Sequence, residues 1–442
     1  MSFLTFGKVR SAAMNSIGAG ALPIAIDFGA GALKLLQLSA GSGNEPPALV
    51  AAAAIETPEH LLSDHAKRFE FQFQALPRLL KGAGFKGKRA VCAIPAGQTF
   101  IKHMQFPKNE SVDLADLVQS GVPAALNCDP DALILRHFAV EGAQAPGSGG
   151  GGAARDSTGM KQEVICMAAA REFVQRIMQA VRDAHLECVG IHPEAVATIR
   201  AFEHINRRIA DQHVSTLYLD LACATTKVWI AHGSTLIFAK TIQLGGRDLD
   251  AAVARALDIG TAAARAKRLA ASVLVAPAMV PACIAAAAAR NALGSGHGPV
   301  ATAEDRRTLD GPKIAPGLTP QVADQSSAPV APPEFDLGDT LENLTDEISM
   351  CLRYYEAMFP GGGGSGGAPA RRVDRAILFG GEARHRGLCQ HIARKLRLPA
   401  HVADPLARMA RTGKEPVRGV DFTTPQPGWT IPFGLCMCPT DL

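Results

Sequence analysis

One pattern occurs twice in the 442-residue sequence, once in each half of the chain. An apolar run typical of a strand ends at an aspartate, a turn of small residues follows, and the chain returns along a second strand. The two copies are Asp27-Phe28-Gly29-Ala30-Gly31-Ala32-Leu33-Lys34 and Asp220-Leu221-Ala222-Cys223-Ala224-Thr225-Thr226-Lys227. Two halves that each open in this way predict a duplicated α/β architecture, with one lobe built around each copy.

Length and composition agree with two lobes. A chain of 442 residues exceeds what one hydrophobic core usually supports, and 47% hydrophobic residues exclude a wholly disordered or fibrous chain. Lysine and arginine outnumber aspartate and glutamate by only 45 to 41, and aromatic residues make up 5% of the chain. Because the charge is nearly balanced and aromatic rings are few, we expect no nucleic-acid partner.

The N-terminus and the cysteines bear on the compartment. Lys8 and Arg10 precede a mildly apolar run, but its glycines and proline and the following Asp27 make a poor signal peptide. We therefore expect a flexible leader over residues 1–22. The ten cysteines are scattered, mostly in apolar runs, as expected of buried thiols in a reducing compartment. The chain has no uninterrupted apolar run of about 18 to 20 residues, so we expect no membrane-spanning helix.

Strand and helix patterns alternate along the rest of the chain. Alternating or short apolar runs predict strands over residues 100–106, 132–140 and 163–169. Helical periodicity predicts helices over residues 71–81, 113–126, 171–184 and 340–359. Runs rich in glycine or proline at residues 142–160, 294–333 and 361–370 interrupt this alternation, and we expect disordered loops there.

The two hairpins carry groups that suit a phosphate ligand. Backbone N–H groups in a turn of small residues are unobstructed and can point at phosphate oxygens. Two such hairpins facing each other across a cleft would hold the phosphates of a nucleotide from both sides. Asp27 and Asp220 could then hold Mg²⁺, and Lys34 could reach the β-phosphate. Aspartate at a strand end is also ordinary turn chemistry, so a structural role stays open for each motif alone.

A third motif lies near the C-terminus. A buried strand at residues 375–379 leads directly into Gly380-Gly381-Glu382 and then a helix. A glycine pair that opens a helix lets a flat ring approach the backbone and places a helix N-terminus near an anion. Together, the three motifs in this order are more specific than any of them alone.

The ordered set resembles the actin, Hsp70 and sugar-kinase superfamily, and within it the PilM family of type IV pilus assembly proteins, relatives of FtsA. The resemblance covers nearly the whole chain outside the three loops. The resemblance also includes short sequence segments at residues 84–88, 101–107, 191–195, 245–249, 264–267 and 431–435. The implied fold is two-lobed and actin-like, with a duplicated mixed-sheet core, an extra subdomain of the FtsA and PilM type, and long disordered loops.

The resemblance also implies how the chain divides into lobes. The first lobe would comprise residues 23–96 and 185–212, and the extra subdomain residues 97–184. The second lobe would comprise residues 213–250 and 372–442. A helical subdomain would span residues 251–371.

By the same resemblance the cleft would bind ATP with Mg²⁺. Asp27 and Asp220 would be the carboxylates associated with the metal, and Glu194 would orient the attacking water. A glutamate at the start of a helix is also favoured by the helix dipole, so a purely structural role for Glu194 stays open. The residues implied in nucleotide binding are Asp27, Gly29, Ala30, Gly31, Ala32, Lys34, Asp220, Ala222, Ala224, Thr225, Lys227, Gly246, Lys267, Gly380, Gly381 and Glu382.

The chain departs from the family pattern in both turns. Ala30, Gly31 and Ala32 stand where serines are usual, and Ala222 stands where glycine is usual. Each hydrogen bond lost to a charged group costs roughly 1.5–3 kcal/mol, so affinity for ATP would fall tenfold or more. We therefore expect ATP binding with slow or absent hydrolysis.

The function that the resemblance implies is assembly of a type IV pilus or a related secretion machine. The protein would be cytoplasmic and peripheral to the inner membrane, binding the cytoplasmic tail of a PilN-like inner-membrane protein and other machine components. The tail would lie between the extra subdomain and the first lobe, near residues 90–94 and 100–106. Oligomers are compatible with this function. Two alternatives stay open: a pseudo-ATPase scaffold without nucleotide and a small-molecule kinase of the same superfamily.

Overall fold

The computed structural model describes residues 20–41, 45–108, 112–143, 161–271, 274, 334–360 and 371–440. The predicted loops at residues 294–333 and 361–370, nearly all of the loop at 142–160, and residues 1–19 of the predicted leader lie outside these ranges. Within them, no helix is long and apolar enough to cross a membrane.

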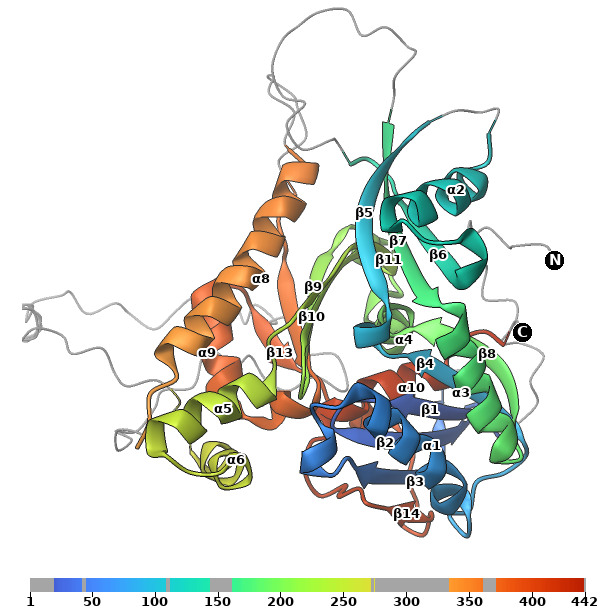
Figure 1. Ribbon diagram of the computed structural model, residues 1–442, viewed down its shortest axis with the longest axis vertical. Helices are drawn as coiled ribbons and strands as arrows, with labels where there is room; N and C mark the ends of the chain where they lie inside the picture. The colour runs from blue at the N-terminus through green and yellow to red at the C-terminus, as the bar shows by residue number, and fades with distance from the viewer. Residues whose placement is uncertain are drawn as a thin grey trace, which may run out of the picture.

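Each copy of the repeated hairpin lies in its own sheet (Figure 1). The first sheet has the strand order β14-β3-β2-β1-β4-β8, and the second has the order β11-β10-β9-β12-β13. The strands of the first sheet are β1 (Ile24–Phe28), β2 (Ala32–Ser39), β3 (Ala48–Glu56), β4 (Arg89–Ile94), β8 (Glu187–Pro193) and β14 (Val417–Arg418). Those of the second are β9 (Ser215–Leu221), β10 (Thr226–His232), β11 (Thr235–Ile242), β12 (Arg375–Phe379) and β13 (Ala400–Val402).

The two hairpins have the same register. Asp27 of β1 pairs with Lys34 of β2, and Asp220 of β9 pairs with Lys227 of β10. In both sheets, the aspartate-bearing strand has a parallel neighbour on its other side, β4 for β1 and β12 for β9. All residues of β1 and β9 are buried, as expected of central strands covered on both faces. The predicted duplication is confirmed.

Helices cover the first sheet on both faces. On one face, α1 (His65–Leu80) and α3 (Arg171–Asp183) pack their apolar stripes against β1, with Leu76 and Ile177 fully buried beside Ile26. The other face carries α4 (Glu194–Phe202) and α10 (Thr430–Cys436), whose buried residues share one core with both large sheets.

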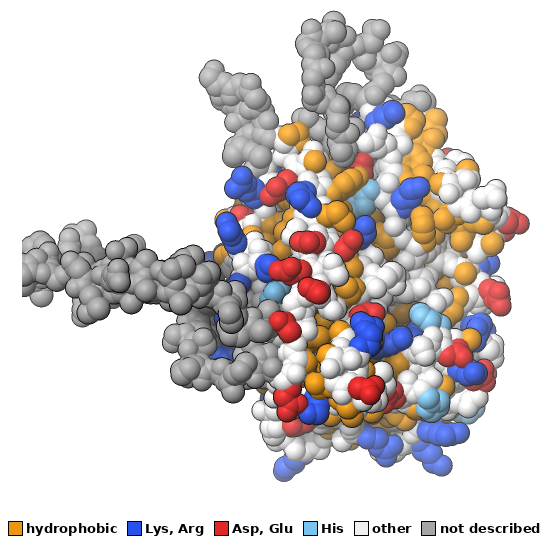
Figure 2. Space-filling model, turned by 60° about the vertical axis from the view of Figure 1, so that its left-hand side comes forward, with side chains coloured by type: hydrophobic (Ala, Val, Ile, Leu, Met, Phe, Trp, Pro, Cys, Tyr) orange, Lys and Arg blue, Asp and Glu red, His pale blue; other side chains and the backbone are white. Residues whose placement is uncertain are grey.

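Four further helices belong to the second lobe (Figure 1). These are α5 (Gly246–Leu257), α6 (Thr261–Ala270), α8 (Gly338–Met358) and α9 (Arg386–Leu396). Leu341, Ile348 and Tyr355 of α8 are fully buried at helical spacing in the core of the second lobe. Figure 2 shows acidic and basic side chains interspersed over this side of the molecule, without one large field of either sign.

The extra subdomain is a three-stranded sheet with one helix. Its strands, in the order β5-β7-β6, are β5 (Phe100–Pro107), β7 (Lys161–Ala170) and β6 (Leu133–Val140). One face packs against α2 (Leu114–Leu126) through a small core that includes Phe106 and Val122. The opposite face meets the second lobe, where His103 of β5 accepts a hydrogen bond from the backbone N–H of Ala239 in β11 (3.3 Å).

Two segments differ from the predicted division into lobes. The predicted second lobe ran to residue 442, but β14 pairs with β3, and α10 packs on α4 and β1. A Cβ on Gly434 would lie 1.8 Å from the carbonyl oxygen of Ala197, so α10 meets α4 in close backbone contact. The C-terminal segment therefore belongs to the first lobe. Similarly, α3 was expected in the extra subdomain, but its buried face packs on the first sheet.

Candidate nucleotide cleft between the two hairpins

The turns of the two hairpins meet at the junction of the lobes. A Cβ placed on Gly31 would lie 3.4 Å from the Cβ of Cys223, so the first turn and the second approach each other closely. Asp27 and Asp220 are each only 4% exposed, and burial raises the pKa of Asp27, to which the nearby charge of Asp220 adds. The structure thus brings together the two aspartates that the repeated pattern predicted as partners.

Hydrogen bonds from each lobe fix the orientation of its own turn. In the first turn, Gln72 of α1 donates to the carbonyl oxygen of Gly29 (2.8 Å) and the N–H of Thr57 donates to that of Gly31 (2.9 Å). In the second, the N–H groups of Gly246 and Arg247 at the start of α5 donate to the carbonyl oxygens of Ala222 and Cys223. In a trans peptide the N–H points opposite to the C=O, so the N–H groups of Ala30, Ala32, Cys223 and Ala224 point away from those donors.

The second hairpin has its own cation. Lys227 Nζ lies 2.8 Å from Asp220 Oδ2 and 2.7 Å from Glu194 Oε2, and all three side chains are buried. Burial alone would lower the pKa of Lys227, but the carboxylates of Asp220 and Glu194 outweigh it and raise that pKa above its ordinary value. Asp220 belongs to the second lobe, whereas Glu194 is the first residue of α4, directly after β8 of the first sheet. Lys227 therefore joins the two lobes.

Glu194 has an unusual protonation equilibrium. Burial raises its pKa to about 7; the charge of Lys227 opposes the shift, whereas Asp220 and Asp27 add to it. Burial is therefore the main reason that this carboxyl group holds its proton more tightly than an ordinary glutamate.

The first hairpin is arranged differently although its register is the same. Asp27 Oδ1 is buried and has no hydrogen-bond partner among the described residues, and burial raises the pKa of this carboxyl group. Lys34 Nζ donates instead to the carbonyl oxygen of Gly428 (2.5 Å), which follows Pro427 in a short turn before α10. Burial lowers the pKa of Lys34. The first aspartate therefore keeps a buried oxygen without a hydrogen-bond partner among the described residues.

The glycine pair of the third motif lies beside Asp220. Gly380 has φ +93°, and a Cβ there would be 2.3 Å from Asp220 Oδ1, so this position requires glycine. The N–H of Gly380 donates to the carbonyl oxygen of Pro427 (3.1 Å). Gly381 has open space where its Cβ would be, in agreement with a flat group approaching this backbone. All three predicted motifs thus border one region.

Glu382 is held in a buried ion-pair chain. Arg268 of α6 is 0% exposed; its Nη1 lies 2.8 Å from Glu382 Oε2, and its Nε lies 2.6 Å from Asp250 Oδ1. A Cβ on Gly246 would lie 2.2 Å from Glu382 Oε1, so a larger residue there would displace this carboxylate from its ion pair. The predicted Lys267 is half-exposed and pairs with Glu334 (2.5 Å) on the surface. Arg268, rather than Lys267, is the α6 residue that reaches the third motif.

Sequence reasoning missed Arg268, Asp250 and Gly428. Arg268 stands four residues after the buried Ala264, on the same face of α6, and this spacing is the one signal that pointed inward. Asp250 lies on α5 and carries no motif. Gly428 is brought to Lys34 by the return of the C-terminal segment to the first lobe.

The donor set does not fit the predicted Mg²⁺. Magnesium demands oxygen ligands at about 2.0–2.1 Å in octahedral order, often including several waters. The carboxylates of Asp220 and Glu194 instead close on one ammonium, and no group of three or more His, Cys, Asp or Glu side chains in the described ranges is placed to hold a metal ion.

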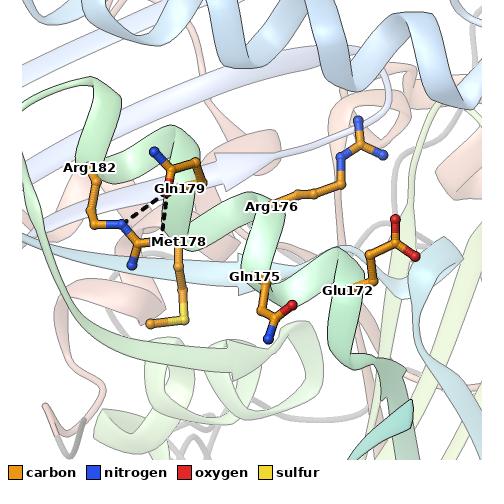
Figure 3. Close-up of a pocket in the computed structure, with 6 residues that line it drawn as sticks. All are labelled: Glu172, Gln175, Arg176, Met178, Gln179 and Arg182. Atoms are coloured by element: carbon orange, nitrogen blue, oxygen red, sulfur yellow. Dashed lines mark hydrogen bonds between the residues drawn. The ribbon is translucent and has the colours of Figure 1, made fainter.

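A surface hollow on the first lobe is lined by residues of α3 and is separate from the candidate site. Figure 3 shows it along the outer face of α3, lined by Glu172, Gln175, Arg176, Met178, Gln179 and Arg182. Arg182 donates to the side-chain oxygen of Gln179 (2.8 Å), an ordinary surface contact one turn away on the same helix. The hollow includes none of the motif residues and offers no converging groups from a second element.

Comparison with known proteins supports the fold. No family model matches the sequence, and neither does any curated protein. A solved chain described as "PilM-PilN type IV pilus biogenesis complex" is 19% identical with a TM-score of 0.61, over 94% of this chain and 97% of that one. This chain therefore has a PilM-like, actin-like fold, as the resemblance implied.

Two further solved structures are less similar. The ethanolamine utilization protein EutJ from Carboxydothermus hydrogenoformans is 12% identical with a TM-score of 0.45, over 95% of this chain and 90% of that one. MreB5 of Spiroplasma citri bound to ADP is 11% identical with a TM-score of 0.42, over 93% and 94%. At TM-scores below 0.5, these two likenesses support no conclusion about ligands.

Proposed function

We propose that this chain is an actin-like assembly protein of a type IV pilus or a related secretion machine, working on the cytoplasmic side of the inner membrane. In this proposal it binds the cytoplasmic tail of a PilN-like inner-membrane protein and carries a nucleotide between its hairpins. The observation that carries the proposal is the likeness along nearly the whole length of both chains to the chain from the PilM–PilN complex.

The two neighbourhoods expected for the partner tail differ in what they can offer. β4, at residues 89–94, pairs with β1 on one side and β8 on the other, so it cannot accept another strand. β5 is an edge strand that pairs with β7 alone in its sheet. An extended tail can add main-chain hydrogen bonds to such an edge. β5 also begins with the exposed Phe100, where the chain leaves the first lobe for the extra subdomain.

Binding of the tail is testable by fluorescence polarisation. The probe is a labelled peptide with the N-terminal cytoplasmic sequence of the PilN-like protein from the same organism. We expect micromolar binding by the wild type and at least tenfold weaker binding by Phe100→Asp. Ile209→Asp is the matched control, because Ile209 is an 81% exposed apolar residue on another part of the surface. No binding by the wild type, or equal effects of both variants, would contradict the proposal.

A nucleotide between the hairpins is the second part of the proposal. It is supported by the buried, unpartnered Asp27 Oδ1, by the four N–H groups that point away from the donors holding their turns, and by the open backbone at Gly381. Hydrolysis would be slow or absent, because Glu194 is engaged by Lys227 rather than free to act as a base. The same pairing disfavours a small-molecule kinase, for which Glu194 was the one candidate base.

A nucleotide-free scaffold is favoured by a different observation. Even a Cβ added to Gly31 would reach the Cβ of Cys223 across the junction, and Lys34 already binds the carbonyl oxygen of Gly428. For a nucleotide to enter, the turns must separate and Lys34 must exchange that carbonyl for a phosphate. Titration with nucleotide distinguishes the two candidates.

A further inference from the structure

We propose that Lys227 is the built-in cation of this junction: its ammonium takes the position between Asp220 and Glu194 that a divalent ion would need, so no Mg²⁺ binds there. Its consequence for ligands, that a phosphate-bearing ligand binds as the metal-free anion, rests on the proposed function. The inference about the metal stands without it.

The geometry leaves no place for a metal between these carboxylates. Asp220 Oδ2 and Glu194 Oε2 each lie within 2.8 Å of the same Lys227 Nζ, and the lysine side chain is only 9% exposed. The ammonium donates a hydrogen bond to Asp220 Oδ2 and forms an ion pair with Glu194 Oε2. A magnesium ion bound directly between these two oxygens would occupy the position of the ammonium and could bind there only by expelling the lysine.

The pairing is specific to the second hairpin and does not follow from strand register. Lys34 stands opposite Asp27 just as Lys227 stands opposite Asp220. Yet Lys34 Nζ binds Gly428, and no ion pair joins it to Asp27 among the described contacts. The difference is Glu194, which α4 brings from the first lobe and which supplies the second carboxylate. Two buried carboxylates facing each other need a cation, and Lys227 provides it from within the chain.

The position of Glu194 also gives the cation a mechanical role. Because Asp220 and Glu194 come from different lobes, Lys227 Nζ joins the lobes in the contact that a shared metal ion would otherwise make. Domain closure then needs no divalent ion. A ligand that brought its own Mg²⁺ would meet a positive charge already in that place, and the two cations would repel each other.

The test is Mn²⁺ binding without nucleotide, followed by the electron paramagnetic resonance signal of free Mn²⁺. Wild type, Lys227→Met, Lys227→Met/Asp220→Asn and, as a control, Lys67→Met are compared. Lys67 is an exposed partner of Asp64 in a surface ion pair, so its loss opens no buried site. We expect about one Mn²⁺ per chain for Lys227→Met, none for wild type or Lys67→Met, and loss of the new site when Asp220→Asn is added.

Two results would overturn the inference: a wild-type Mn²⁺ site abolished by Asp220→Asn, or a folded Lys227→Met that binds no Mn²⁺. If Mn²⁺ raises the melting temperature of Lys227→Met but not that of the wild type, the inference is supported. If it does not fold at all, the wild-type arm decides. A parallel ATP titration in EDTA separates the two proposals. Failure to bind ATP would contradict the proposed nucleotide binding and would leave the result on the metal unchanged.

Discussion

The hairpins β1–β2 and β9–β10 repeat one design, and their lysines have different partners. Both place a lysine directly opposite an aspartate across an antiparallel pair. Lys227 closes on Asp220 and Glu194, whereas Lys34 turns to the carbonyl oxygen of Gly428 and leaves Asp27 Oδ1 without a partner. Strand register sets which side chains face each other, but a third element from elsewhere in the chain decides which contact forms. The second hairpin is neutralised internally, and the first keeps groups for a ligand.

The largest expected effect is on stability, and it separates the two lysines. Lys227→Met leaves two buried carboxylates without their cation, so it should lower the free energy of unfolding by about 3–5 kcal/mol. Lys34→Met removes one hydrogen bond to a carbonyl and should cost about 1–2 kcal/mol. Urea unfolding of both variants measures the difference. Equal costs would show that the two hairpins are energetically alike and would break the comparison.

The second expected effect is a dependence of stability on pH that comes from Glu194. Its pKa is about 7 in the folded protein and 4.5 for an ordinary glutamate. The folded state therefore binds more protons between these values, so this contribution to stability is complete below pH 4.5 and is lost as the pH rises through 7. Relative to Glu194→Gln, the wild type should lose about 1–3 kcal/mol between pH 4.5 and 8.

Unfolding curves of wild type and Glu194→Gln at several pH values measure this loss. Glu203→Gln is the control, because Glu203 is half-exposed and pairs with Arg200 on the surface. The Glu203 variant should follow the wild-type pH profile. Parallel profiles for wild type and Glu194→Gln would mean that Glu194 is fully ionised beside Lys227.

The smallest effect concerns the turns themselves. Gly29 of the first turn corresponds to Ala222 of the second, and a Cβ on Gly29 would lie 3.1 Å from the carbonyl oxygen of Ala32. Gly29→Ala should therefore cost only about 0.5–1 kcal/mol. Gly97→Ala, where a Cβ meets open space, should cost less. A larger loss for Gly29→Ala would mean that the first turn tolerates less change than the second.

Much of the fold followed from local patterns. The strand expected at residues 100–106 is Phe100–Pro107, and the helix expected at residues 113–126 is Leu114–Leu126 with Asp113 as its N-cap. The helix expected from residue 71 begins at His65, because its first turn is polar and only the cap at Asp64 marks the start. The return of β14 and α10 to the first lobe had no local signal, since pairing between distant strands is set by tertiary packing.

The candidate site was predictable where sequence spacing carried the chemistry. The repeated spacing from aspartate to lysine identified Asp27, Lys34, Asp220 and Lys227 as one set, and the structure brings them to one junction. The partner of each lysine was not predictable, because Glu194 and Gly428 reach the hairpins through α4 and the C-terminal segment. The Mg²⁺ expectation did not fit for the same reason. The spacing identified Asp27 and Asp220, but it did not show that the ammonium of Lys227 lies between Asp220 and Glu194.

The central claim is that the first hairpin binds a ligand, whereas the carboxylates at the second are neutralised by Lys227. Titration of a fluorescent ATP analogue against wild type and Lys34→Met, in Mg²⁺ and in EDTA, tests this claim most directly. We predict micromolar binding by the wild type that changes less than twofold between Mg²⁺ and EDTA, and at least tenfold weaker binding by Lys34→Met. Turnover should stay far below one per second. Absence of binding at millimolar nucleotide, or binding that disappears in EDTA, would contradict the claim.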